Sequence, residues 1–504
     1  MRYAEPVDPW ATGEAAAFGA VHGPPEPWLA SAQPGSGRGI GGPGAASGGS
    51  GKAYKKRVLW VVAAAAVIVL GVAATLTVVF WPKYPALDFH PLGEVRRVPA
   101  AAKMGSGFVA SAVRGDRAYF ASVDARFTDS ESLGVVAADL ATGKVKWSRA
   151  GVAVAARWEQ LLATPDAVVA ISARDSISGT RLMELLDPGT GKEIFQTKIG
   201  GDDNVMFTGD VVLQIDRVNA RLVAYNVRTG QQRWSTPNPV GQYDVKTTAV
   251  IKSTTVADDA GPASTGGVAF AAPVDDDTRV VQIGGDRSAQ VIDAETGKVR
   301  LTLAAVADPG DDVIAHNGRL IVSESDTVRR IVAYDLVKAG QPKVLYQATQ
   351  AGSRIEHLTE CGADRVCFVE TVDTASKVVA VDAAKGGSGW ARPLAGVDNL
   401  VPVGDSVLAI QDSPTAQATL LDAKGKVAWT KPGEVARLDA GNLLVFSKPL
   451  STIANQPSLS GVHLGDSQVE LGPLGDQRSG SCSWDTAFIA CVGQTEFEIQ
   501  KFAG

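Results

Sequence analysis

A short pattern recurs through most of the chain and constrains its fold more than any other feature. In its two clearest copies, Ala137 to Trp147 and Ala224 to Trp234, an Asp or Asn is followed by Thr-Gly and, eight residues after it, by a Trp. The Asp or Asn anchors of all copies, weaker ones included, are Asp139, Asp187, Asn226, Asp293, Asp335, Asp382 and Asp422. Their separations are 48, 39, 67, 42, 47 and 40 residues. A period of this length is typical of one four-stranded unit in a repeat architecture.

The residue types in the pattern suit a turn followed by an outer strand. An Asp or Asn side chain accepts hydrogen bonds from nearby backbone N–H groups, and Gly takes the positive φ that such a turn needs. The large residue that follows then lies on the outer strand, where its ring packs between neighbouring units. We therefore predict that these residues dock one unit on the next: Trp147, Phe195, Trp234, Trp390 and Trp429.

The repeats predict an all-β fold, an about eight-bladed β-propeller over residues 95–504, with seven and nine blades as the alternative counts. The separation of 67 residues exceeds one blade, and 257–267 (ADDAGPASTGG) has the composition of an inserted loop. At the end of the chain, 488–492 and 496–502 are expected to be strands. A strand near 94–98 would complete their blade, so that both ends of the domain close the ring.

The pattern resembles the tryptophan-docking motif of the pyrroloquinoline-quinone-like β-propeller repeat family. The family includes quinoprotein alcohol dehydrogenases, the outer-membrane assembly lipoprotein of Gram-negative bacteria and sensor domains of membrane kinases, so the resemblance implies a fold and leaves the function open. In the dehydrogenases the activity goes with a disulfide between adjacent cysteines, a calcium site and often C-x-x-C-H. The sequence has none of these patterns. We expect neither an enzyme nor a cofactor.

Four cysteines predict two disulfides. Cys361 and Cys367 bracket one turn, and Cys482 and Cys491 bracket another; each pair leads into an apolar strand. Cross-strand spacing of this kind suits disulfides in an oxidising compartment. A metal site is the alternative, but the sequence has no C-x-x-C, and His357 is the one histidine within four residues of a cysteine. We expect no metal.

The N-terminal part predicts a membrane anchor. Residues 1–57 are rich in Gly, Pro, Ala and Ser and are expected to be a disordered cytoplasmic tail. Residues 58–81 lack charge and are long enough for a transmembrane helix, followed by a stem over 82–94. Lys55, Lys56 and Arg57 precede the span, so the positive-inside bias predicts a cytoplasmic N-terminus and an extracytoplasmic propeller. A cleaved signal peptide is the alternative, but this stretch is too long and starts too late.

Two segments of the tail resemble each other. Asp8-Pro9-Trp10 and Glu26-Pro27-Trp28 each place an acid and a proline beside a large aromatic residue. Such triplets are typical of short motifs that anchor in a partner's pocket, although chance in a proline-rich tail also produces them.

Charge and motifs favour a protein-binding function. The net charge is −6 with no strongly basic block, which disfavours a nucleic-acid partner. The five histidines are scattered, and no nucleophile or phosphate-binding motif has a structural frame. We expect a single-pass envelope protein that binds other envelope proteins, through loops such as 257–267 or 447–459. The alternatives are a quinone-dependent oxidoreductase and a sensor of a small ligand in the central channel.

Overall fold

A computed structural model describes residues 84–504 except 106, 128–129, 242–248, 255–260, 266–278, 309, 326–328, 349, 351, 413–415, 449–455, 466 and 479. All regular elements of this part are strands. No helix within it is long and apolar enough to cross a membrane. The predicted tail, the predicted span over 58–81 and the Asp8-Pro9-Trp10 and Glu26-Pro27-Trp28 triplets lie outside the described residues.

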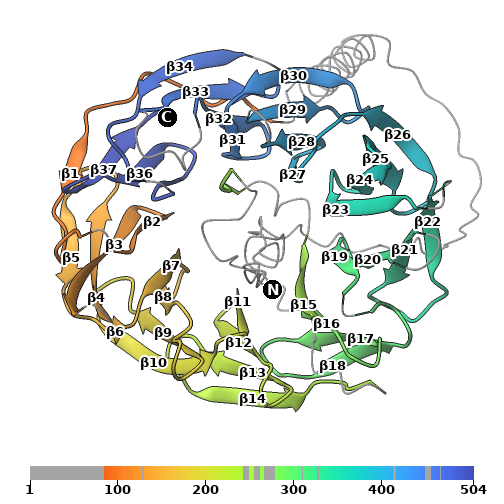
Figure 1. Ribbon diagram of the computed structural model, residues 1–504, viewed down its shortest axis with the longest axis horizontal. Helices are drawn as coiled ribbons and strands as arrows, with labels where there is room; N and C mark the ends of the chain where they lie inside the picture. The colour runs from red at the N-terminus through yellow and green to blue at the C-terminus, as the bar shows by residue number, and fades with distance from the viewer. Residues whose placement is uncertain are drawn as a thin grey trace, which may run out of the picture. The chain divides into compact units, whose positions relative to one another are not determined.

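The strands form consecutive four-stranded antiparallel sheets, each with its first strand innermost (Figure 1). Blade 1 comprises β2 (Val109–Arg114), β3 (Arg117–Phe127), β4 (Ser130–Asp139) and β5 (Val145–Arg149), with β6 (Val154–Ala155) added beside β4. Blade 2 comprises β7 (Trp158–Ala163), β8 (Val168–Ser172), β9 (Thr180–Leu186) and β10 (Glu193–Gly200). Blade 3 comprises β11 (Asn204–Thr208), β12 (Val211–Asp216), β13 (Arg221–Asn226) and β14 (Gln232–Pro237).

A short parallel pairing between the first strands of blades 4 and 5 joins these two blades into one sheet. Blade 4 comprises β15 (Ala249–Thr254), β16 (Arg279–Ile283), β17 (Ala289–Asp293) and β18 (Val299–Leu303). Blade 5 comprises β19 (Asp312–His316), β20 (Arg319–Glu324), β21 (Arg330–Asp335) and β22 (Lys343–Gln347). Blade 6 comprises β23 (Arg354–Glu360), β24 (Arg365–Val372), β25 (Ala375–Asp382) and β26 (Ser388–Pro393).

The last blades bring the two ends of the domain together. Blade 7 comprises β27 (Asn399–Val403), β28 (Ser406–Gln411), β29 (Gln417–Leu421) and β30 (Val427–Pro432). Blade 8 comprises β31 (Glu434–Arg437), β32 (Asn442–Phe446), β33 (Ser458–His463) and β34 (Gln468–Pro473). Blade 9 comprises β35 (Ser483–Trp484), β36 (Phe488–Val492), β37 (Phe497–Lys501) and, as its outer strand, β1 (Arg96–Val98), so both ends close the ring as the sequence predicted.

The core consists of nine apolar clusters, and each of them lies between two neighbouring blades. Trp147 of blade 1 and Trp158 of blade 2, for example, share one cluster. Phe497 of blade 9 stacks on Phe120 of blade 1, with ring centroids 4.6 Å apart, in the cluster that closes the ring. The stability of the fold therefore depends on contacts between blades as well as on pairing within each sheet.

The described strands make nine blades, which lies within the range of seven to nine that the sequence left open around a count of about eight. Blades 1 to 7 each contain an Asp or Asn anchor of the repeat, whereas blades 8 and 9 have none. Blade 8 has His463 where an Asp or Asn anchor would stand, and its ring Nδ1 accepts from Gly465 N at 3.2 Å. Blade 9 is divided between the two ends of the domain, so that no continuous stretch of sequence contains it.

Antiparallel pairing gives the ring two distinct faces. The turns between third and fourth strands, which contain the Asp or Asn anchors, lie on one face together with the connections between first and second strands. We call this the anchor face. The turns between second and third strands, and the connections from one blade to the next, lie on the other face, the linker face.

Candidate functional site

The anchor turns join neighbouring blades through one repeated contact. Asp139 accepts hydrogen bonds from Thr142 N at 2.9 Å and Thr142 Oγ1 at 2.8 Å, which holds the turn, and Gly143 has a φ of 69°. Bonds from Lys146 and Thr142 lower the pKa of Asp139 to about 2. After the turn, Trp147 on β5 reaches blade 2, where its Nε1 donates to Pro188 O at 3.0 Å. The carbonyl that follows the anchor of one blade thus receives the indole of the preceding blade.

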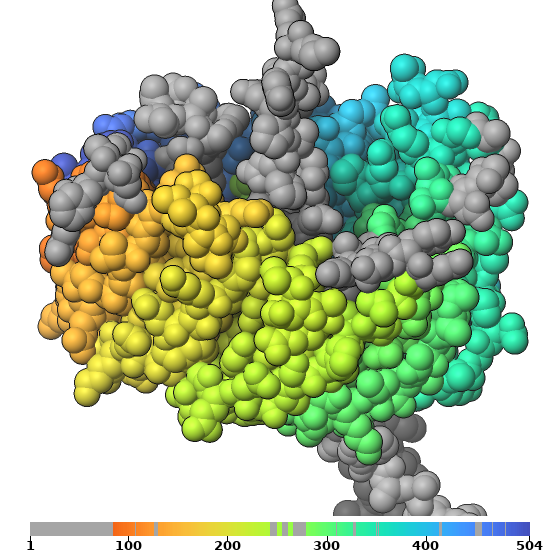
Figure 2. Space-filling model, turned by 60° about the horizontal axis from the view of Figure 1, so that its bottom comes forward, coloured from red at the N-terminus to blue at the C-terminus, as the bar shows by residue number. Residues whose placement is uncertain are grey.

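Other predicted docking residues lie in the same place. Trp234 Nε1 donates to Ala294 O at 2.8 Å, and Trp390 Nε1 donates to Ala423 O at 3.3 Å. Phe195 has no donor, but its ring lies against Gly230 of blade 3. Trp429 is buried beside blade 8, where its Nε1 has no partner among the described residues. The contact thus repeats between successive blades, whose surfaces follow one another in chain order around the near side of the molecule in Figure 2.

The ring closes through a docking residue that sequence reasoning missed. Arg96 of β1 lies against Gly143, and its Nη1 donates to Leu140 O at 3.1 Å, the carbonyl that follows the anchor of blade 1. Arg96 thus takes the place that Trp has in other blades. Its side chain also lies over the ring of Phe488, 5.5 Å from the centroid. The one sequence feature that could have indicated the docking role of Arg96 is its position on the strand that completes blade 9.

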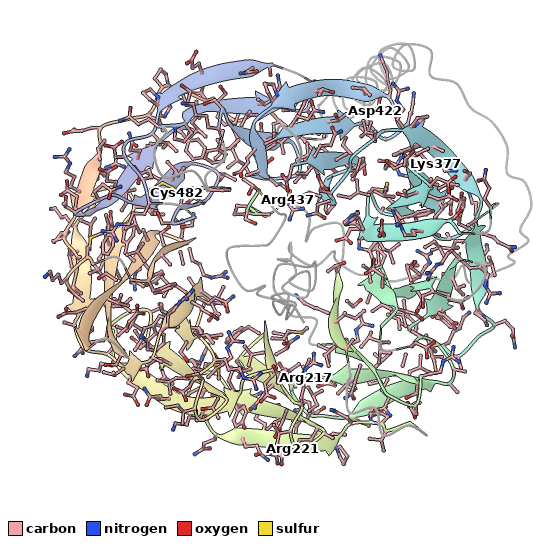
Figure 3. All side chains as sticks on the ribbon, in the orientation of Figure 1. Arg217, Arg221, Lys377, Asp422, Arg437 and Cys482 are labelled. Carbon is pink, nitrogen blue, oxygen red and sulfur yellow. A yellow bond between two sulfur atoms is a disulfide. The ribbon has the colours of Figure 1, made fainter. Side chains whose placement is uncertain are left out.

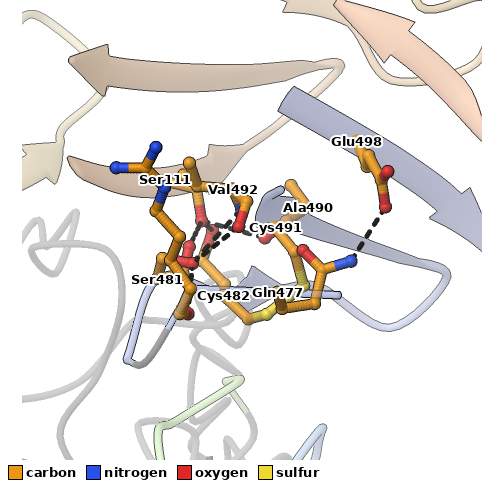
Figure 4. The surroundings of a disulfide bond; sticks show 10 residues. Ser111, Gln477, Ser481, Cys482, Ala490, Cys491, Val492 and Glu498 are labelled. Atoms are coloured by element: carbon orange, nitrogen blue, oxygen red, sulfur yellow. Dashed lines mark hydrogen bonds between the residues drawn. A yellow bond between two sulfur atoms is a disulfide. The ribbon is translucent and has the colours of Figure 1, made fainter. Parts of the chain in front are cut away.

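Both disulfides join the cysteines that the sequence paired. Cys361 and Cys367 link the ends of the β23–β24 hairpin in blade 6 and are buried. Cys482 and Cys491 link the segment before β35 to β36 in blade 9 (Figure 4). Beside the second pair, Ser111 Oγ donates to Ser481 O at 2.7 Å and so joins blade 1 to blade 9. The two disulfides therefore stabilise blades and lie apart from each other.

Buried acids lie inside two blades. Glu184 on β9 is fully buried; its Oε2 accepts from Gln196 Nε2 at 2.8 Å, and its Oε1 has no partner among the described residues. Burial raises its pKa to about 8, against a smaller opposing effect of the Gln196 bond. Glu370 on β24 is also buried, but Lys377 and Tyr346 bind its Oε2 at 2.6 and 2.7 Å. There burial is outweighed by these bonds, and the pKa of Glu370 is lowered.

The part of the chain that the structure describes contains no cluster of metal-binding groups. No three His, Cys, Asp or Glu side chains there gather in a way that would hold a metal ion. His316 is buried against Thr254, whereas His463 serves in the blade 8 turn.

Four exposed apolar side chains lie on the linker face of consecutive blades. Among the described residues, nine large apolar side chains are exposed. Four of them, Val145, Val299, Val344 and Val469, lie on outer strands, and Val337 lies on the anchor face. The other four lie in linker-face segments that run from blade 1 to blade 4, and their exposed fractions are 58% for Val154, 95% for Ile177, 74% for Val218 and 53% for Val240.

Hydrogen bonds join the segments that present these side chains. Ala173 N donates to Arg157 O at 2.8 Å, and Gly201 N donates to Gly179 O at 2.9 Å. Further along, Asn238 N donates to Ala220 O at 2.8 Å. We call the joined segments, residues 154–157, 173–179, 200–203, 216–220 and 238–241, the linker-face ridge.

A buried aspartate holds the middle of the linker-face ridge. Asp203 is 1% exposed and accepts hydrogen bonds from Gly200 N at 2.7 Å, Gln214 Nε2 at 2.6 Å and Arg217 N at 2.9 Å. It therefore fixes the connection between blades 2 and 3 to the turn that presents Val218. This role of Asp203 could not be predicted from the sequence, because the bonded residues lie in different blades or in different turns.

The docked ring of repeats, with an anchor turn receiving the preceding blade, defines a β-propeller of the pyrroloquinoline-quinone-like repeat type. The chain belongs to the family described as outer membrane protein assembly factor BamB, whose family model matches residues 94–236 and 219–372. No curated protein sequence matches the chain.

Solved structures resemble the chain at low sequence identity. BamB from Moraxella catarrhalis is 12% identical, with 82% of this chain and 99% of that chain covered and a TM-score of 0.39. A europium-containing methanol dehydrogenase is 13% identical, with 70% and 85% covered and a TM-score of 0.38. The computationally designed Ika8 protein is 11% identical, with 68% and 96% covered and a TM-score of 0.41. The family assignment rests on the sequence match and not on these scores.

Proposed function

We propose that the protein is a scaffold of the cell envelope, anchored in the membrane by residues 58–81, that binds other envelope proteins through the linker-face ridge. The observation that supports this most is the ridge itself. Its apolar tips are exposed, and exposed apolar groups on one surface of a domain are typical of interaction sites. The family to which the chain belongs is named for an outer-membrane assembly factor, which agrees with a binding role.

The ridge is suited to binding because its backbone is already ordered. The bonds of Asp203, and those between neighbouring segments, hold the tips on a rigid scaffold. Binding of a partner then does not require these loops to be ordered first, so less conformational entropy is lost on binding. The salt bridge between Arg174 and Asp202, 2.6 Å long, adds a polar border next to Ile177.

The test compares the two faces at equal exposure. Val218→Asp replaces a 74% exposed valine of the linker face by a charged residue. Val337→Asp does the same at a valine of the anchor face that is also 74% exposed. Combined with Ile177→Asp, the first change should abolish crosslinking of full-length protein to envelope partners in intact cells, whereas Val337→Asp should not affect it. Both variants should keep the wild-type melting temperature. If the linker-face variant crosslinked to envelope partners as well as the wild-type protein does, the ridge would be excluded as the binding surface.

A second measurement addresses catalysis and a third addresses topology. Purified full-length protein given pyrroloquinoline quinone and Ca²⁺ should bind no chromophore and oxidise no alcohol or sugar; turnover would contradict the scaffold proposal.

Protease added outside cells stripped of their wall should digest or release the propeller and spare the tail. A protected C-terminal domain would contradict the proposed orientation.

A further inference from the structure

The segment that leads into the propeller, residues 87–93, is docked on the anchor face. Leu87 N donates to Asn442 Oδ1 at 3.0 Å, at the start of β32, the second strand of blade 8. His90 N donates to Phe502 O at 2.9 Å, just after the end of β37, the third strand of blade 9. Second strands begin and third strands end on the anchor face. The chain therefore enters the propeller at this face, and we call residues 87–93 the entry segment.

Apolar contacts hold the entry segment in place. The ring of Phe89 stacks on that of Phe502, with centroids 6.3 Å apart. It also covers Gly461 of β33, where a built Cβ would be 2.4 Å from ring carbon Cδ1 of Phe89. Leu87, Phe89 and Leu92 pack against the core cluster that blades 8 and 9 share. The entry segment is therefore part of the packed domain.

The entry segment and the linker-face ridge lie on opposite faces of the ring. Gly504 N donates to Asp88 O at 3.2 Å, so the C-terminal residue lies beside the entry segment on the anchor face. Blade 8 lies between Asp422 of blade 7 and Cys482 of blade 9 (Figure 3). The ridge, in contrast, runs over the linker face of blades 1 to 4. The chain that precedes the propeller thus meets it on the face away from the ridge.

The membrane span that we propose ends close to the entry segment in the sequence. Trp81, the last residue of the span over 58–81, is six positions before Leu87. Six residues reach at most about 22 Å even when they are fully extended. Because Leu87 is bonded to blade 8, a span that ends at Trp81 keeps the membrane surface within about this distance of the anchor face.

We propose that the entry segment holds the anchor face of blades 8 and 9 at the membrane surface, so that the linker-face ridge points away from it. The inference rests on the proposed membrane anchor. A partner of the ridge then approaches from the side away from the lipid. It is a soluble domain, or the part of an envelope protein that extends beyond the propeller, and not a segment embedded in the bilayer.

Two single cysteines on blade 8 test this orientation in the full-length protein, inserted into vesicles of phosphatidylethanolamine and phosphatidylglycerol. All four native cysteines are in disulfides, so Ser467→Cys and Gln456→Cys each supply the one free thiol. Both residues are exposed. Ser467 lies in the anchor-face turn between β33 and β34, and Gln456 lies in the linker-face connection between β32 and β33. The two sites therefore compare the two faces at one blade.

A donor dye on each thiol transfers energy to an acceptor dye attached to the lipids. Transfer from the Ser467→Cys protein should be at least about twofold more efficient than from the Gln456→Cys protein, because about 20 Å of strand separates the two faces. Equal transfer, or more transfer from Gln456→Cys, would overturn the proposal. Protein that fails to sediment with the vesicles would instead contradict the membrane anchor on which the proposal rests.

A longer connection tests whether the short distance to the span sets the orientation. Inserting about 20 Gly and Ser residues between Pro82 and Lys83 leaves the entry segment docked but adds an average reach of about 25 Å. The difference in transfer between the two sites should then shrink at least about twofold. The same insertion between Gly41 and Gly42, in the predicted tail, is the control and should leave the difference unchanged. A difference that persists after the first insertion would show that the short connection does not hold the anchor face at the membrane.

Discussion

The indole of Trp147 lies directly against Gly191 of the next blade. A Cβ built on Gly191 would be 2.4 Å from ring carbon Cε3 of Trp147, closer than packed atoms come. The Gly and the Trp of the repeat therefore have a joint role across the blade boundary: the Gly of one blade leaves the space that the Trp of the preceding blade fills. The same relationship joins Trp234 to Gly297 and Trp390 to Gly425.

Gly191→Ala should destabilise the protein more than an alanine at a glycine that nothing contacts. Gly115 is the matched control, because its φ of 59° is close to the 68° of Gly191 and a Cβ there meets no atom within 4 Å. Both variants incur the cost of a positive φ, about 1 to 2 kcal/mol, and Gly191→Ala adds about 1 to 3 kcal/mol for the clash. Denaturant unfolding measures the difference, and equal values would contradict the docking contact.

Trp147→Ala should lower the free energy of unfolding by about 3 to 5 kcal/mol, as for other buried aromatic residues removed from packed sites. Trp234→Ala should cost less, because Trp234 is only partly buried. Trp147→Phe keeps most of the apolar contact and should fall between wild type and Trp147→Ala. A loss below about 1 kcal/mol for Trp147→Ala would mean that the ring contributes little to the interface.

Glu184 should make the protein less stable as the pH rises. Its pKa is about 8 in the folded protein, above the ordinary value of 4.5, so between these values the folded state keeps a proton that the unfolded chain has lost. The contribution of Glu184 to the free energy of unfolding is therefore most favourable below pH 4.5, and it falls as the pH rises towards 8. Glu184→Gln should remove this fall, on the order of a few kcal/mol between pH 5 and pH 8, in urea melts at both pH values.

Glu370→Gln is the control of opposite sign. Its lowered pKa means that the ionised form stabilises the fold above the ordinary pKa of a glutamate, and that this contribution is lost on acidification. The variant should therefore be less stable than wild type near neutral pH and approach it in acid. If Glu184→Gln behaved in the same way, Glu184 would be ionised in the folded protein.

Replacing Cys361 and Cys367 together by alanine should reduce stability by about 2 to 3 kcal/mol, the effect of opening a short loop. The same loss is expected for Cys482 and Cys491. Peptide mapping without reducing agent should recover both linked pairs from the wild-type protein. A free thiol or a crossed pair would contradict the placement of these residues in blades 6 and 9.

The parts of the fold that the sequence predicted are those with local causes. Asp139 and Thr142 bond within one turn, and a repeated turn is visible as a repeated pattern. The closing strand followed from the need to complete a blade. His463 and Arg96 were missed as substitutes for an anchor and a docking Trp, because their roles depend on position in the ring and not on residue type.

The candidate surfaces were harder to predict, since they depend on contacts between distant segments. Composition indicated an insertion near 257–267, but not that Ala263 binds Arg437 on the opposite blade. The other predicted loop, 447–459, lies on the linker face of blade 8; Ser447 N donates to Ser458 O at 2.9 Å, and 449–455 lie outside the described residues. The linker-face ridge had no sequence signal, because single exposed valines are common.

The pairing of β1 with β37 sets a condition on synthesis of the chain. Val98 is synthesised early and stays unpaired until its register partner Phe497 is synthesised near the end of the chain. A chain that stops before Phe497 lacks the strand that pairs with β1, and Phe120 of blade 1 then has no ring of Phe497 to stack on. Unfinished or truncated copies thus differ from complete ones by exposed aromatic surface, which chaperones and proteases recognise before the protein reaches any partner.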